Sequence, residues 1–186
     1  ASLRQATAPF PDLYADTLGM LGRALSVLGR HSESLNTAQQ ARALAEKWAQ
    51  DTGDESLVAR ALGHLAHAHF TAGQAAEGTR VQQQAADLAL RVGDHSDHAI
   101  HTGNLATLTW MQGNPEAALQ HARQARQSYQ RLNALHGHMA AINEVTLGLA
   151  TAHSGQLGEA LDTLQGAVRS LGPGAPPAGM AKARIA

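Results

Sequence analysis

The sequence predicts an all-α protein built from four antiparallel helix pairs stacked side by side. The 186-residue chain contains 38 alanines and 24 leucines, whereas valine and isoleucine together number nine and aromatic residues six. This composition favours helices over a β-sandwich or barrel. Five of the six prolines lie near the chain ends, so the interior is free of helix breakers except at Pro115. An internal repeat then defines the pairs.

The repeat is anchored by four glycines, Gly29, Gly73, Gly113 and Gly155, with spacings of 44, 40 and 42 residues. Eight residues before each glycine stands a leucine, and a small residue follows that leucine. Five residues after each glycine stands another small residue, and twelve after it an alanine. These columns comprise Leu21, Leu65, Leu105 and Leu147; Gly22, Ala66, Ala106 and Gly148; Ser34, Gly78, Ala118 and Ala160; and Ala41, Ala85, Ala125 and Ala167.

Each column has a packing role in this interpretation. The glycine supplies the left-handed residue that ends the first helix of a pair. The small residues let the two helices of a pair approach closely, and the leucine fills the space between one pair and the next. No pair can bury its apolar stripe alone, so stability requires neighbouring pairs. In the last helix the stripe comprises Ala160, Leu161, Leu164, Ala167, Val168 and Leu171.

The helices follow in order from these signals. We expect first helices at residues 12–28, 55–72, 96–112 and 137–154, and second helices at 32–51, 75–92, 115–132 and 157–171. The Gly-Asp pairs at 53–54 and 93–94 each give a helix stop and a cap for the next helix. Asn114 before Pro115 predicts an N-cap followed by a proline in the first helical position. The array therefore covers residues 12–171, with an N-terminal extension at 1–11 and a Pro/Gly-rich linker and tail at 172–186.

Composition also disfavours several classes of function. The formal net charge of −1 provides no field that would gather nucleic acid or an anionic membrane surface. The absence of cysteine excludes disulfides and thiolate chemistry. No apolar run approaches the roughly 18 residues that a membrane-spanning helix needs, so we expect a soluble, cytoplasmic protein. No GxSxG or HExxH sequence and no phosphate-binding loop occurs, and we expect neither catalysis nor a cofactor.

The repeat resembles the tetratricopeptide repeat, whose pattern is a leucine and a small residue in the first helix, a glycine near the turn and two alanines in the second helix. The resemblance covers about residues 12–171. It departs from the family in having repeats longer than the usual 34 residues, few aromatics and no closing proline. The longer form is similar to repeats in bacterial regulatory and signalling proteins and in kinesin light chains. The resemblance implies a right-handed α-solenoid, a superhelix whose first helices line a concave groove.

The inward positions of the family, placed on this sequence, predict a binding wall. It runs from charged and polar in the first two repeats to apolar in the last two, which suits a peptide or helix with an acidic end and a hydrophobic end. Trp110 and Phe70 are the candidate anchors, and Arg23 and Arg60 the candidate carboxylate ligands. A core role for Trp110, a structural role for Trp48 and solvated arginines are the alternatives. The partner-binding candidates are Arg23, Arg60, His67, Phe70, Thr107, Trp110, Met111, Leu149 and His153, and the same projection includes Asp16, Gly19 and Ser26.

The eleven histidines raise the alternative of a metal site. The candidate groups are His64, His67 and His69; His95, His98 and His101; and His136 with His138. Imidazoles at such spacing can bind one zinc or nickel ion. No carboxylate recurs at a ligand spacing, however, and helix ends are solvent-facing places where histidine costs little. We therefore predict no bound metal.

The sequence thus favours a non-catalytic protein-binding or peptide-binding module that uses a concave groove, either as a scaffold or as part of a larger regulatory protein. One alternative is a sensory domain of a bacterial regulator, which binds a small signal or peptide and transmits a change in superhelix pitch. A histidine-bound metal protein is a third interpretation. A second copy of the chain, docked on a terminal repeat, is a further candidate partner.

Overall fold

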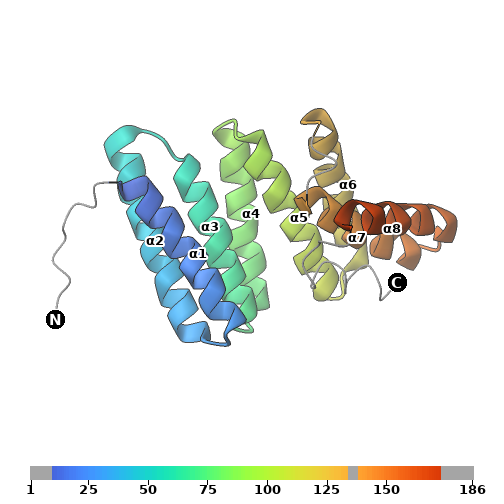
Figure 1. Ribbon diagram of the computed structural model, residues 1–186, viewed down its shortest axis with the longest axis horizontal. Coiled ribbons are helices and arrows are strands. Elements are labelled where there is room, and N and C mark those ends of the chain that lie inside the picture. Colours follow the sequence, from blue (N-terminus) through green and yellow to red (C-terminus); the bar gives the residue numbers. More distant parts are fainter. Residues whose placement is uncertain (1–9, 134–137, 173–186) are drawn as a thin grey trace. The chain divides into compact units, whose positions relative to one another are not determined.

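The computed structural model describes residues 10–133 and 138–172, which form eight α-helices and no strand (Figure 1). The helices are α1 (Pro11–Val27), α2 (His31–Thr52), α3 (Ser56–Thr71), α4 (Ala75–Arg91), α5 (His95–Met111), α6 (Pro115–Arg131), α7 (His138–His153) and α8 (Leu157–Leu171). The all-α prediction is confirmed, and every expected helix end lies within one residue of the observed one. Among the described residues, none of the helices combines the length and apolarity required to span a bilayer.

The chain divides after Asp94 into two compact units of two helix pairs each. In the first unit α1 pairs with α2 and α3 with α4, and α3 also packs against both α1 and α2. The second unit repeats this arrangement with α5 to α8. One continuous array over residues 12–171 stays a prediction. The predicted extension and tail lie almost wholly outside the described residues.

Left-handed glycines end the first helix of each pair. Gly29, Gly73, Gly113 and Gly155 have φ angles of +74°, +80°, +77° and +83°, where side-chain-bearing residues are strained. At Gly29 the chain reverses while the Arg30 amide donates to the Leu25 carbonyl at 2.9 Å, which closes the end of α1.

Side-chain hydrogen bonds to backbone amides lie at the starts of α6, where Asn114 is the N-cap, and of α3, where Asp54 precedes the N-cap Glu55. The Asn114 side chain accepts a hydrogen bond from the Ala117 amide at 3.1 Å, and Pro115 is the first residue of α6. Before α3, Asp54 Oδ1 accepts from the Ser56 amide at 2.9 Å. This bond lowers the pKa of the Asp54 carboxyl because it favours the charged form.

Small residues lie where the two helices of a pair meet. A Cβ added to Gly22 would lie 3.3 Å from the Ser34 carbonyl oxygen, and one added to Gly78 would lie 3.0 Å from that of Ala66. Ser34 is fully buried, and its hydroxyl donates to the Gly22 carbonyl at 2.7 Å. Backbones this close leave no room for larger side chains. The alanine column, Ala41, Ala85, Ala125 and Ala167, is buried throughout, as are Ala66, Ala106, Ala118 and Ala160.

The leucine column is not uniform. Leu65 is 3% exposed and Leu147 is 1% exposed, and Leu147 packs beside Leu119 and Ala122 of α6. Leu105 is also buried, but Leu21 is 49% exposed. The inter-pair packing role predicted for Leu21 is therefore wrong, because the described residues include no second helix on that side of α1.

The apolar stripe of α8 is only half buried. Leu164 and Leu171 are covered, whereas Leu161 and Val168 are exposed. The expectation that the whole stripe is core is wrong for those two residues, since no helix pair follows α8 within the described part of the chain.

Candidate functional site

On the first unit, α1 and α3 lie side by side and bring opposite charges together. Asp16 Oδ1 of α1 lies 3.7 Å from Arg60 Nε and 3.8 Å from His64 Nε2 of α3. Room for the His64 ring comes from Gly19, where a Cβ would stand 2.2 Å from the ring Cδ2. We call this surface the α1/α3 face and define it by Asp16, Arg23, Ser26, Arg60, His64 and His67.

A second contact on the α1/α3 face joins Ser26 to His67, whose Oγ and Nε2 atoms lie 3.0 Å apart. The Ser26 hydroxyl donates to the Arg23 carbonyl at 2.7 Å. Both contacts are satisfied together when the His67 proton is on Nε2, because that N–H can then donate to the Ser26 oxygen.

Both imidazoles on this face are held neutral. Burial, with the neighbouring charges of Arg23 and His64, lowers the pKa of His67 to about 4. Burial and Arg23 also lower the pKa of His64, against an opposing effect from Asp16. At pH 7 the charges on the face are thus two guanidinium groups and one carboxylate. Arg60 shares Asp16, whereas Arg23 is exposed and forms no ion pair within the described residues.

On the second unit, α5 and α7 form a different face. The rings of Trp110 and His153 meet edge to face, with centroids 6.3 Å apart and an interplanar angle of 82°. The hydroxyl oxygens of Thr107 and Thr146 lie 3.1 Å apart. Trp110 is half-buried, so it is neither fully core nor free, and Met111 beside it is exposed. We call this surface the α5/α7 face and define it by Thr107, Trp110, Met111, Thr146, Leu149 and His153.

Two of the predicted candidates have mainly packing contacts. Leu149 is half-buried against the cluster that contains Val145 and Leu164. Phe70 is half-buried, and its Cβ lies 3.3 Å from where a Cβ of Gly78 on α4 would be. The structure therefore gathers Arg60 and His67 with Asp16 and Ser26 on one unit, and Trp110 with His153 on the other. Binding at either face stays a prediction.

The histidine groups form no metal site in the part of the chain that the structure describes. No cluster of three or more His, Asp or Glu side chains there has the geometry of a metal site, and His136 lies outside the described residues. His98 and His101 are buried rather than solvent-facing. The expectation of exposure was wrong for them because nine of the 17 residues of α5 are buried.

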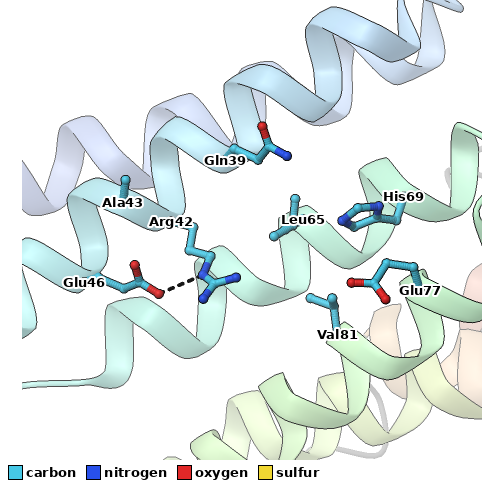
Figure 2. Close-up of a pocket in the computed structure, with 8 residues that line it drawn as sticks. All are labelled: Gln39, Arg42, Ala43, Glu46, Leu65, His69, Glu77 and Val81. Carbon is cyan, nitrogen blue, oxygen red and sulfur yellow. Dashed lines mark hydrogen bonds and ion pairs between the residues drawn. The ribbon is translucent and has the colours of Figure 1, made fainter.

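A pocket on the first unit was missed by the sequence interpretation. It opens between α2, α3 and α4 (Figure 2) and is lined by Gln39, Arg42, Ala43, Glu46, Leu65, His69, Glu77 and Val81. The available signal was the register of the repeats, which places Arg42 and Arg126 at the same position of their second helices.

Comparison with protein families identifies the repeat. Residues 57–131 match the model of the tetratricopeptide repeat. The match covers 75 of the 186 residues, so tetratricopeptide repeats are shown for this part of the chain. Comparison with curated proteins finds no significant match.

Solved structures resemble this chain at low sequence identity. A Rap protein complexed with competence and sporulation factor is 14% identical, with a TM-score of 0.72 over 86% of this chain and 43% of its own. The kinesin light chain-like repeats from Podosopora anserina are 17% identical, with a TM-score of 0.68 over 92% and 82%. The Rap conjugation gene regulator of plasmid pLS20, in complex with a Phr peptide, is 18% identical, with a TM-score of 0.72 over 86% and 42%. These similarities show the fold, and the chain spans less than half of either Rap protein.

Proposed function

We propose that this chain is an array of tetratricopeptide repeats and a non-catalytic module that binds a protein or peptide segment on the exposed faces of its first helices. The observation that carries the proposal is that α1 packs beside α3, and α5 beside α7. This packing gathers charged groups on one face and an aromatic pair on the other. Acidic side chains suit the guanidinium groups of Arg23 and Arg60. Large apolar side chains suit Trp110 and Met111.

Two proteins of the same fold support the proposal. The Rap protein described above was solved with competence and sporulation factor, and the Rap regulator of plasmid pLS20 with a Phr peptide. Helix-pair arrays of this kind can thus hold a peptide.

The test begins with a random peptide library displayed on phage and selected against the full chain. Selected peptides should contain acidic and large apolar residues, and their affinities are then measured by fluorescence anisotropy. Arg23→Ala should weaken the binding of peptides rich in acidic residues, and Trp110→Ala that of peptides rich in large apolar residues, each by about tenfold or more, as truncation of an interface anchor does. Trp48→Ala is the control, because Trp48 packs against the core of the first unit. Equal losses in all three variants would show general destabilisation and contradict the proposal.

A sensory role within a larger regulator is the second candidate. It is favoured by the fold similarity to a protein described as a conjugation gene regulator. A sensor must differ in shape between its free and bound states, so a selected peptide should change the small-angle X-ray scattering profile of the chain. A scaffold would bind the peptide with the profile unchanged.

The exposed side of α1 supports a further proposal, that a second copy of the chain docks there through its α8. Within the second unit Leu119 packs beside Leu147. The repeat register makes Leu161 the counterpart of Leu119, and Leu21 that of Leu147. Both are exposed, so Leu161 of one copy can meet Leu21 of another as Leu119 meets Leu147.

Sedimentation velocity tests this association. The wild-type chain should self-associate as concentration rises, and Leu21→Glu or Leu161→Glu should each abolish the effect. Leu90→Glu, on an exposed position of α4, is the matched control. A chain that stays monomeric at every concentration would refute the docking.

A further inference from the structure

The pocket between α2, α3 and α4 belongs to neither of the first-helix faces. Its volume is about 390 Å³, which lies within the range of sites that accommodate ligands. Leu65 and Val81 are buried and form its floor, while charged side chains of α2 and α4 stand at its sides (Figure 2). An occupant would therefore meet an aliphatic surface below and charged groups beside it.

The charged side chains around the pocket differ in how many of their hydrogen-bonding groups already have a partner. Glu77 accepts hydrogen bonds from Arg80 with both carboxylate oxygens, so its charge is already paired. Arg42 donates to Glu46 through Nε at 2.7 Å, which leaves the terminal amino groups of the guanidinium outside that bond. A guanidinium has five N–H donors in all. The pocket therefore has hydrogen-bond donors of Arg42 to offer.

The second unit shows which contacts an arginine at this repeat position forms when acceptors lie nearby. Arg126 on α6 corresponds to Arg42 in the repeat register, and it binds both carboxylate oxygens of Glu144 and lies 3.3 Å from Thr163 Oγ1. In this way it bridges α6 to α7 and α8. Its side chain is 28% exposed, against 43% for Arg42.

The first unit lacks both acceptors. By the same register Leu62 stands in place of Glu144, and Val81 in place of Thr163. Arg42 consequently has no polar group to reach on α3 or α4 at these positions and pairs along its own helix with Glu46 instead. The two differences leave a guanidinium beside an apolar floor.

We propose that this pocket is a second binding site, for a peptide segment that carries an aliphatic side chain next to an acidic one. The aliphatic side chain packs on Leu65 and Val81, and the carboxylate accepts hydrogen bonds from the terminal amino groups of Arg42. The peptide carboxylate thus contacts Arg42 as the Glu144 carboxylate contacts Arg126 in the second unit. This site does not depend on binding at the α1/α3 or α5/α7 face.

A segment fits this pocket better than a free small molecule. The side chains of Arg42, Glu46 and Glu77 are 43%, 42% and 41% exposed, so the pocket walls stay accessible to solvent. Small-molecule sites usually bury 70–90% of their ligand, which such walls do not provide. A peptide adds contacts along α2 and α4 outside the pocket, and these compensate for the incomplete enclosure.

The proposal is tested by nuclear magnetic resonance titration of the full ¹⁵N-labelled chain. The probe is acetyl-Gly-Leu-Glu-Gly amide, and two comparison peptides replace Glu by Gln or Leu by Ala. The Leu-Glu peptide should shift amide signals around the pocket on α2, α3 and α4. Both comparison peptides should bind about tenfold more weakly or worse, because each lacks one of the two contacts.

Three variants sharpen the test. Arg42→Gln, at a partly exposed position, should lose about tenfold or more in affinity. Arg126→Gln changes the corresponding arginine of the second unit and should leave the affinity unchanged. The double variant Leu62→Glu with Val81→Thr supplies Arg42 with the acceptors of the second unit and should abolish binding. Its helical circular dichroism shows whether it folds. If it does not fold, the affinity of Arg42→Gln decides whether the proposal holds.

Four results would overturn the proposal. Equal binding of the Glu and Gln peptides would remove the role of Arg42. Signal shifts confined to α1 or α7 would place binding on the first-helix faces instead. Free leucine that binds as tightly as the peptide would make the site one for a small zwitterion. Absence of any shift at millimolar peptide would leave no site at this pocket.

Discussion

Single glycines in this fold have opposite roles according to what surrounds them. A Cβ at Gly78 would lie 3.0 Å from the Ala66 carbonyl oxygen and 3.1 Å from the Phe70 nitrogen, which are backbone atoms that cannot move independently. A Cβ at Gly166 on α8 would meet only the end of the Arg169 side chain, at 3.9 Å. The small-residue column of the repeat includes Gly78 but not Gly166, and the structure shows the contacts that separate them.

We therefore expect alanine substitutions at these two glycines to change stability in opposite directions. Gly78→Ala should lower the free energy of unfolding by about 1–3 kcal/mol through overpacking. Gly166→Ala should raise it by about 0.5–1 kcal/mol, because alanine loses less backbone entropy in a helix. Urea denaturation followed by circular dichroism measures both. A Gly78→Ala variant as stable as the wild type would mean that α3 and α4 are less closely packed than described.

His67 makes the stability of the fold depend on pH, and the direction of this dependence follows from the lowered pKa of His67. The ordinary pKa of 6.5 applies to the unfolded chain, and in the folded protein the value is about 4. The unfolded chain therefore binds the proton more tightly, so stability is complete above pH 6.5 and falls as the pH drops toward 4. The lowered pKa of His64 acts in the same direction.

The measurement compares urea midpoints at several pH values for the wild type and His67→Gln. The variant should lose less stability than the wild type between pH 6.5 and 4, while carboxyl titrations contribute equally to both. Parallel curves for the two proteins would show that His67 titrates normally. A ring-proton titration of His67 should give a midpoint well below 6.5.

At the scale of whole elements, the repeat register predicts the helices well but not the burial of each helix face. The glycine and alanine columns located both ends of all eight described helices within one residue because turns and close contacts admit few residue types. The leucine column has the same residue in four helices, yet Leu21 is exposed and Leu147 is buried. Periodicity specifies which side of a helix is apolar, whereas burial depends on whether a neighbouring helix covers it.

This difference predicts unequal effects of one substitution along the leucine column. Leu65→Ala and Leu147→Ala should each cost about 2–5 kcal/mol, as buried leucine truncations do. At protein concentrations low enough to keep the chain monomeric, Leu21→Ala should cost no more than about 0.5 kcal/mol, in the range of surface changes. Urea denaturation of the three variants checks the order. A large loss at Leu21 would mean that another helix covers the outer side of α1 in solution.

At the scale of the whole molecule, the sequence predicted the repeat class and missed the long-range side-chain contacts. The family match at residues 57–131 agrees with the columns recognised in the sequence. Arg42 and Arg126 occupy the same repeat position, but only the second contacts a carboxylate on a neighbouring helix. Which carboxylate an arginine contacts depends on the side chains that face it from neighbouring helices. A repeat pattern shows only which positions of the repeats correspond.

The two first-helix faces also differ in the interactions that they offer a partner, and we therefore expect their contributions to binding to respond differently to salt. The α1/α3 face presents guanidinium groups, so its contribution to binding is weakened as salt screens the charges. The α5/α7 face presents Trp110 and Met111, whose contribution comes from buried apolar area and depends little on salt. For a selected peptide, the logarithm of affinity should fall with the logarithm of salt concentration. For peptides rich in acidic residues, Arg23→Gln should reduce that slope. For peptides rich in large apolar residues, Trp110→Ala should lower affinity at every salt concentration and leave the slope unchanged. A slope that Arg23→Gln does not alter would show that the charged face takes no part in binding.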